Sequence, residues 1–174
     1  MFFNPLQMTQ AKGAFQHAEK LTSHYFRLSQ DKMQSHRYDV KTLAYLEDHE
    51  VKDGAFAHLC KYHYSKDEKE NHLSGFHFYR VCLQDNRILD AVERGGSFIK
   101  LKPLMLYIAA HELAHIIRFD TGEIDFDASL EEKEQEEERV HAITRDILQS
   151  SMYPDLKIVL DCFSKRYKIG DFFN

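Results

Sequence analysis

The sequence has little of what marks a secreted or membrane-spanning protein. It contains three cysteines in 174 residues, Cys60, Cys82 and Cys162, and this odd number at wide spacing gives neither a disulfide framework nor a Cys-x-x-Cys metal motif. The first residues lack the basic segment and long apolar core of a secretory signal. No apolar run is long enough to cross a bilayer. We therefore expect a cytoplasmic protein whose cysteines are buried apolar side chains.

A surplus of positive charge is also missing. The formal net charge is −5 at pH 7, which indicates no basic surface for nucleic acid or for an anionic membrane. Hydrophobic residues make up 43% of the chain and charged residues 29%, as in ordinary globular proteins. The length suffices for one domain with its own core, and no repeat or linker divides it. We expect residues 1–174 to form a single domain.

Hydropathy patterns predict an α+β fold that is mainly helical. Apolar stripes at helical spacing predict three helices early in the chain: residues 6–33, 38–48 and 54–64. Residues 76–84 are rich in aromatic and β-branched side chains and predict a strand. A turn at Asp85 and Asn86 would lead into two further short strands, residues 87–92 and 97–101. We thus expect a small antiparallel sheet that precedes the helices of the second half.

The second half of the chain is predicted to be helical. The apolar segment 104–119 predicts a buried helix, with Pro103 in its first turn and Gly122 as its left-handed stop. A Glu-rich helix and a last helix follow: residues 129–149 and 155–167. The charged residues 65–75 are expected to form an exposed loop, residues 123–128 a second loop and residues 169–174 a short tail.

Three polar residues interrupt the apolar helix, in the sequence His-Glu-Leu-Ala-His at 111–115. Burying an unpaired polar group costs about 2–7 kcal/mol, so these side chains need a partner. His111 and His115 are four residues apart on one helix face and can bind the same metal ion. The H-E-x-x-H motif combines two zinc ligands with a general base, here Glu112 acting on a metal-bound water. The competing interpretation is two buried histidines and a chance glutamate in a chain with 11 histidines.

A catalytic zinc site requires a third protein ligand and an open position for water. The glutamates at 131–138 resemble a solvated charge run, but the helical phase set by Val140 and Thr144 turns Glu137 toward the apolar side. We predict Glu137 as the third ligand, with one zinc ion per chain. Other carboxylates remain as alternatives: Glu134, Glu138, Asp125 and Asp127.

The motif at 111–115, followed by Glu137 on the next helix, resembles the gluzincin metallopeptidases, which include thermolysin and the small minigluzincins. The resemblance covers about residues 76–148 and implies a zincin-like fold and zinc-dependent hydrolysis of a peptide or protein substrate. In that group an Asp four residues after the glutamate supports the first metal histidine, whereas this chain has His141 there, so this support is altered. The longer H-E-x-x-H-x-x-G-x-x-H pattern fails, because Arg118 and Thr121 replace its Gly and last His.

Two other classes of function stay open. Glu112 with His115, and Glu138 with His141, are both Glu-x-x-His pairs, as in di-iron carboxylate helical proteins. Against this class, His111 would have no role there and strand-like segments interrupt the helices. The other class is a non-catalytic zinc domain on a peptidase-like scaffold, in which His141 closes the metal site as a fourth ligand.

Peptide hydrolysis also requires a donor for the developing oxyanion and a surface for the substrate backbone. Three side chains have suitable chemistry as donors: Tyr107, His141 and Arg145. An edge strand within residues 76–92 would pair with an extended substrate by strand addition.

Overall fold

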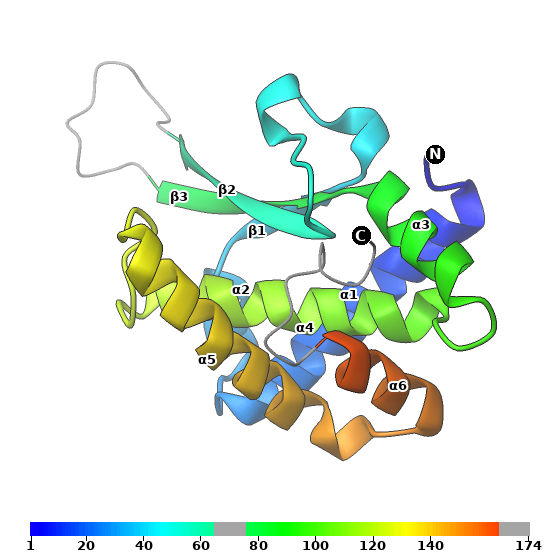
Figure 1. The fold of residues 1–174 in the computed structure, drawn as a ribbon. Helices are drawn as coiled ribbons and strands as arrows, with labels where there is room; N and C mark the ends of the chain where they lie inside the picture. The colour runs from blue at the N-terminus through cyan, green and yellow to red at the C-terminus, as the bar shows by residue number, and fades with distance from the viewer. Residues whose placement is uncertain (65–75, 164–174) are drawn as a thin grey trace.

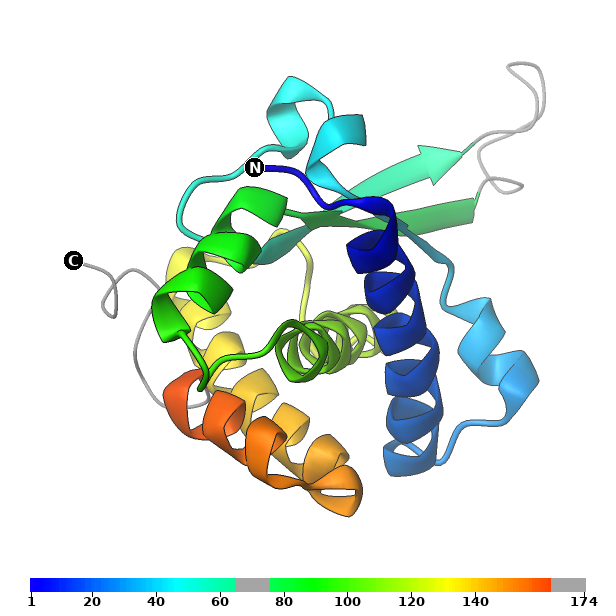
Figure 2. The ribbon, with the colours of Figure 1, turned by 90° about the vertical axis from the view of Figure 1, so that its right-hand side faces the viewer.

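A single helix, α4 (Leu101–Asp120), runs through the middle of the molecule in a computed structural model that describes residues 1–64 and 76–163. Figure 2 shows α4 end-on, with the sheet on one side and helices on the others. Every residue of α4 from Pro103 to Arg118 is buried. A helix that is apolar around most of its circumference can only be stable when other elements surround it.

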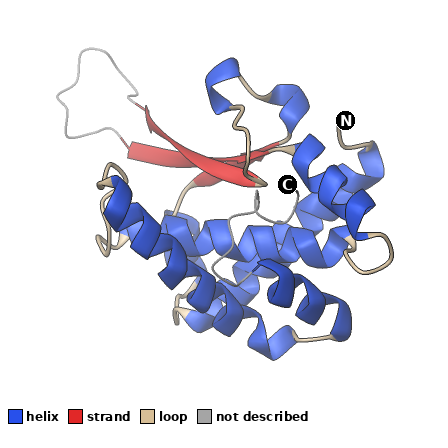
Figure 3. Ribbon diagram, in the orientation of Figure 1, coloured by secondary structure: helices blue, strands red, loops and turns tan. Residues whose placement is uncertain are grey.

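The sheet has three strands in the order β1-β3-β2 and covers one side of the helices (Figures 1 and 3). Strand β3 (Phe76–Leu83) lies in the centre, parallel to β1 (Tyr38–Lys41) and antiparallel to β2 (Ala57–Tyr64). Tyr79, Val81 and Leu83 alternate onto one fully buried face of β3 and join the core with α4. The opposite face carries Arg80 and Cys82.

Five more helices complete the described part of the chain: α1 (Pro5–Tyr25), α2 (Gln30–Ser35), α3 (Asp85–Gly95), α5 (Leu130–Leu148) and α6 (Pro154–Phe163). Three short 3-10 turns lie between elements: Leu43–Tyr45, Asp48–Glu50 and Gln149–Ser151. Helix α5 begins with a capping box, in which Ser129 accepts a backbone hydrogen bond from Glu132 and the Glu132 side chain accepts one in return. No helix of the described residues is long and apolar enough to cross a membrane.

The prediction of a mainly helical α+β chain is confirmed, and so are several elements. Residues 76–84 form a strand, and the helices predicted at 104–119 and 129–149 are α4 and α5. Helix α4 ends at Asp120, and Gly122, two residues later, has φ +75° and donates to the Phe119 carbonyl, while the Glu123 amide donates to the Arg118 carbonyl. This is the Schellman pattern that a glycine after a helix predicts. The helix predicted at 155–167 corresponds to α6, which is described as far as Phe163. The end of that prediction, residues 164–167, and the predictions for residues 65–75 and 169–174 lie outside the described residues.

The predicted helix over residues 6–33 is wrong in length, because α1 ends at Tyr25 and α2 is a separate helix. Arg27 adopts φ +54°, donates to the His24 carbonyl, and is followed by a bond from Leu28 to Ser23. This is the same Schellman arrangement with arginine in the position that glycine usually takes. No glycine marks the break, so the apolar stripe alone extends the helix too far.

The helices predicted at 38–48 and 54–64 are wrong. These segments form β1 with two 3-10 turns, and β2. Cross-strand pairing with β3 decides the conformation of such short segments more strongly than their intrinsic propensity. The antiparallel sheet is corrected to a mixed one, since β1 runs parallel to β3.

The strands predicted at 87–92 and 97–101 are also wrong. Residues 85–95 form α3, whose buried Ile88 and Ala91 are three residues apart and face the core. Asp85 anchors its first turn by accepting hydrogen bonds from the backbone amides of Phe3 and Leu43 at 2.8 and 2.9 Å. Six residues are too few to separate helical from strand periodicity. Residues 97–100 form the turn that leads into α4.

Candidate metal centre

Two helices bring the predicted ligands together. His111 and His115 lie one turn apart on α4, and their Nε2 atoms are 3.1 Å apart. Glu137 projects from α5 between them, with its two carboxylate oxygens 3.2 Å from His111 Nε2 and 3.0 Å from His115 Nε2. The imidazoles are only 9% and 7% exposed, whereas about half of the Glu137 side chain is exposed.

The donor set fits a zinc ion. Ligand atoms about 2.0–2.1 Å from a tetrahedral zinc lie about 3.3–3.4 Å from one another, close to the 3.0–3.2 Å found among these three groups. Among the described residues, the buried Nδ1 atoms of His111 and His115 have no hydrogen-bond partner, so the protein offers no acceptor there for the N–H that each ring would keep when Nε2 binds a metal. Two neutral imidazoles and a carboxylate are the ligand types of a catalytic zinc site.

The other carboxylates considered as third ligands lie elsewhere. Glu134 and Glu138 are exposed on the outer side of α5. Asp125 and Asp127 are exposed in the loop before it, where Asp125 accepts a hydrogen bond from the Asp127 amide. Glu137 is therefore the carboxylate that the fold brings to the two histidines.

The sequence alone did not predict the ion pair that holds α5 in place. Arg118, near the end of α4, forms a bidentate pair with Glu136, which is 2% exposed. Its Nη2–Oε2 distance is 3.2 Å. The pair holds α5 against α4 and orients the next residue, Glu137, toward the histidines. An arginine within an otherwise apolar helix was the available indication that a buried carboxylate must face it.

His141 lies beside the three ligands, one turn after Glu137. Its Nε2 atom is 3.8 Å from Glu137 Oε2, and its ring centroid is 4.7 Å from that of His111. Its Nδ1 atom is 2.7 Å from the Tyr107 hydroxyl, which is also 3.2 Å from the Phe163 carbonyl. A carbonyl only accepts, so both contacts are satisfied when Tyr107 donates to Phe163 and accepts from His141 Nδ1–H. That tautomer leaves a lone pair on His141 Nε2.

Burial sets the charge states of the site. Burial lowers the pKa of His141 to about 4, with a further lowering by His111, so the ring is neutral near pH 7. Burial alone would raise the pKa of Glu137, but its hydrogen bonds with His111 and His115 lower it overall. The same carboxylate raises the pKa of His111 against the effect of burial.

Glu112 lies beside the two histidines but forms no part of their cluster. It is 7% exposed, and burial raises its pKa, opposed by the neighbouring His111 and His115. A carboxylate with a raised pKa in such a position is suited to accept and release a proton.

The two remaining oxyanion candidates have other partners. The Tyr107 hydroxyl is used by His141 and Phe163, so Tyr107 positions His141. Arg145 lies on α5 with its Nη2 atom 3.8 Å from Asp161 of α6. His141 groups with His111 and Glu137 as a possible metal ligand, but in the tautomer that Tyr107 favours its Nε2 atom carries a lone pair and cannot donate to an oxyanion.

The carboxylates that a di-iron site would need are dispersed. Glu138 is exposed. Two glutamates from the first segments of the chain, which could supply the further carboxylates of such a site, have other partners: Glu19 accepts a hydrogen bond from Tyr38, and Glu50 binds Arg80 on the outer face of the sheet. No group of metal-ligating atoms among the described residues includes any of them.

No protein-family model, curated protein or solved structure matches this chain.

Proposed function

We propose that the protein is a zinc-dependent peptidase in which His111, His115 and Glu137 hold one zinc ion. The observation that supports this most strongly is the convergence of three side chains: the two Nε2 atoms are 3.1 Å apart, and each lies 3.0–3.2 Å from one oxygen of the Glu137 carboxylate. The order of sheet, motif helix and glutamate helix agrees with a zincin-like fold, as the gluzincin resemblance implies. On this basis we place the chain among the hydrolases.

Glu112 is the proposed general base and acid. When bound, zinc supplies Lewis acidity that brings the pKa of water to about 7. Glu112 accepts a proton from the attacking water and then delivers it to the leaving amine of the substrate. Its burial raises its pKa and so suits it to hold that proton between the two steps.

The proposed substrate surface is the free edge of β2. Among the described residues β2 pairs only with β3, so its other edge is open for an extended peptide. The edge strand expected within residues 76–92 is not found there, which corrects that prediction: residues 76–83 form the central strand β3, paired on both sides, and residues 85–95 form α3.

The direct test of the centre is metal content. We expect Glu137→Ala to contain about one zinc ion per chain fewer than the wild-type protein, as measured by elemental analysis after dialysis. Glu138→Ala is the matched control, because it removes the adjacent, exposed glutamate. Equal zinc in Glu137→Ala and wild type would exclude this ligand set. A peptide-library screen then compares wild type with Glu112→Gln.

A second candidate function is a closed, non-catalytic zinc centre, which the lone pair on His141 Nε2 favours. The 3.8 Å separation of that atom from Glu137, longer than the other three distances, favours the open site. His141→Ala distinguishes the two. In a closed site its zinc affinity falls as steeply as that of Glu137→Ala, whereas in an open site zinc is retained. Hydrolysis that survives His141→Ala at full rate would exclude His141 as a ligand.

A further inference from the structure

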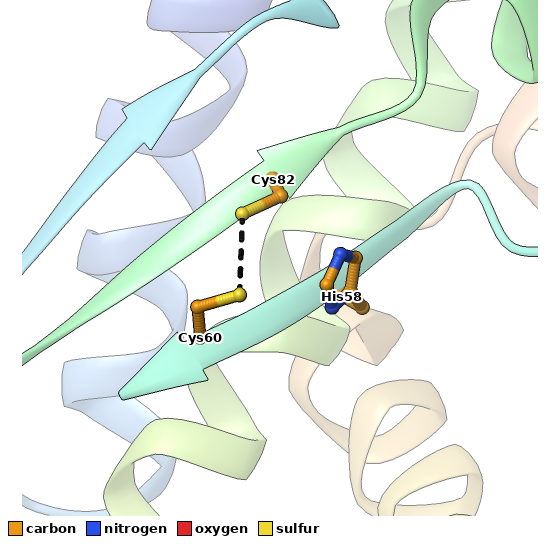
Figure 4. Close-up of side chains that lie close together, drawn as sticks. All are labelled: His58, Cys60 and Cys82. Atoms are coloured by element: carbon orange, nitrogen blue, oxygen red, sulfur yellow. Dashed lines mark hydrogen bonds between the residues drawn. The ribbon is translucent and has the colours of Figure 1, made fainter. Parts of the chain in front are cut away.

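A second cluster of ligating side chains lies on the face of the sheet that points away from α4. His58 and Cys60 are two residues apart on β2, so both side chains point to this face, as does that of Cys82 on β3 (Figure 4). One ring nitrogen of His58 and the two sulfur atoms lie within 4.8 Å of one another. None of these residues takes part in the proposed hydrolysis.

The spacing of the two sulfurs fits a shared ion better than a disulfide bond. The Sγ atoms are 3.9 Å apart, whereas two thiolates about 2.3 Å from a tetrahedral zinc lie about 3.8 Å apart. In the strand register Cys82 is opposite His58 and Cys60 is opposite Arg80, so the cysteines are diagonal neighbours. Diagonal Cα atoms are roughly 7–8 Å apart, beyond the usual reach of a disulfide.

The imidazole of His58 is held in the tautomer that a metal ligand needs. Its Nε2 atom is 2.6 Å from the backbone carbonyl of Glu50, which can only accept, so Nε2 carries the proton. Nδ1 then keeps its lone pair. Gln84 donates to the same carbonyl at 3.1 Å and fixes its position. A histidine that donates to a backbone carbonyl through its second nitrogen is the usual support of a metal ligand.

The neighbouring carboxylate, Glu50, already has hydrogen-bond partners, so the cluster's available ligands are the imidazole and the two thiols. Glu50 is fully buried and accepts hydrogen bonds from Tyr62, Arg80 and the Glu47 amide. Cys82 is fully buried, while His58 and Cys60 are partly exposed, so an ion can reach the cluster from solvent. Burial raises the pKa of the Cys82 thiol, with Cys60 adding to the effect, so the metal-free thiol is protonated.

We propose that His58, Cys60 and Cys82 form a second metal site, which binds a thiophilic divalent ion of the zinc type. Binding releases two protons, one from each thiol, and the two thiolates balance the charge of the ion while His58 binds as a neutral ligand. The site joins β2 and β3 at the sheet face that the Glu50 segment covers. It shares no ligand with the centre on α4 and α5.

Cobalt(II) titration of the reduced, full-length chain tests the proposal. Thiolate ligands give cobalt an intense charge-transfer absorption, whereas His111, His115 and Glu137 offer no sulfur. We expect this band in wild type and in Glu137→Ala, and its loss in Cys60→Ser and Cys82→Ser. Cys162→Ser is the matched control and keeps the band, because Cys162 lies on α6, outside the cluster.

His58→Gln keeps the test decisive if Cys82→Ser does not fold. We expect its cobalt affinity to fall by more than the 10–100-fold that loss of a supporting group causes, since a direct ligand is removed. A wild-type protein with three free thiols and no charge-transfer band would overturn the proposal. So would an intact mass showing a Cys60–Cys82 disulfide in the purified protein, or a band that disappears in Cys162→Ser.

Discussion

The two clusters of ligating side chains differ in the elements that build them and in the charge they carry. The centre on α4 and α5 consists of two imidazoles and a carboxylate, held by two helices that an ion pair clamps together. The cluster on the sheet consists of two thiols and an imidazole, held by the register of two strands. Glu112, the proposed general base, lies beside the first, and no base is proposed for the second. On these proposals the first is the reactive centre and the second is a structural one.

The largest expected effect separates these roles. Glu112→Gln should lower peptide hydrolysis by about 10²–10⁴-fold, because the amide cannot accept the proton of water. Both metal sites should keep their ions, since Glu112 is a ligand of neither. Steady-state kinetics and metal analysis on the same sample make the measurement. Cys60→Ser is the comparison, expected to retain hydrolysis within about twofold, and an equal loss of rate in both variants would show that the two clusters act as one.

The next effect concerns the clamp between the helices. Arg118→Met leaves Glu136 buried without its main partner, and we expect a loss of about 3–5 kcal/mol in the free energy of unfolding. Because α5 carries Glu137, zinc affinity at the helical centre should fall, while the thiolate charge-transfer band stays unchanged. Urea denaturation measures the stability.

Two controls accompany that experiment. Arg139→Met removes an exposed arginine that also lies near Glu136, at 3.5 Å, and should change stability by about 0.5 kcal/mol or less. The double change Arg118→Met with Glu136→Leu should recover much of the loss, since no unpaired charge remains. A single variant as stable as wild type would show that the pair contributes nothing to the docking of α5.

The smallest effect concerns Glu50, which lies beside the sheet cluster, and it appears only at acidic pH. Burial alone would raise the pKa of Glu50, but hydrogen bonds from Tyr62, the Glu47 amide and Arg80 lower it to about 2. Glu50 therefore contributes its full stabilisation to the free energy of unfolding above its unfolded pKa of about 4.5. This contribution is lost as the pH falls toward about 2. Thermal unfolding of Glu50→Gln should show a weaker dependence on pH in this window. Glu134→Gln, at an exposed position, should follow wild type.

The helical centre was predictable because its spacing is local. Residues four apart on any helix share a face, so His111 and His115 fall together once α4 is recognised. Glu137 followed from the phase of Val140 and Thr144 on α5, where the alternatives Glu134 and Glu138 turn outward. The partner of Glu136 was not foreseen, because the register of α5 against α4 depends on packing between distant segments.

The sheet cluster was not predictable in the same way. Cys60 and Cys82 are far apart in sequence, and only the pairing of β2 with β3 brings them together. Residues 54–64 have an apolar pattern compatible with a helix, and on that prediction the two thiols would have no reason to meet. The strand predicted at residues 87–92 is wrong for the opposite reason. The short apolar pattern of this segment favours a strand, but the segment belongs to helix α3, which begins at Asp85.

Glu136 and Glu137 are adjacent in the chain but have separate partners, and this has an evolutionary consequence. Successive side chains of a helix point about 100° apart, so one glutamate docks α5 while the next reaches the histidines. Inserting or deleting one residue between them and Val140 would turn both away from their partners in a single step. Homologous sequences should therefore vary within α5 by substitution, and change length in the exposed connection before Ser129, where gaps cost little.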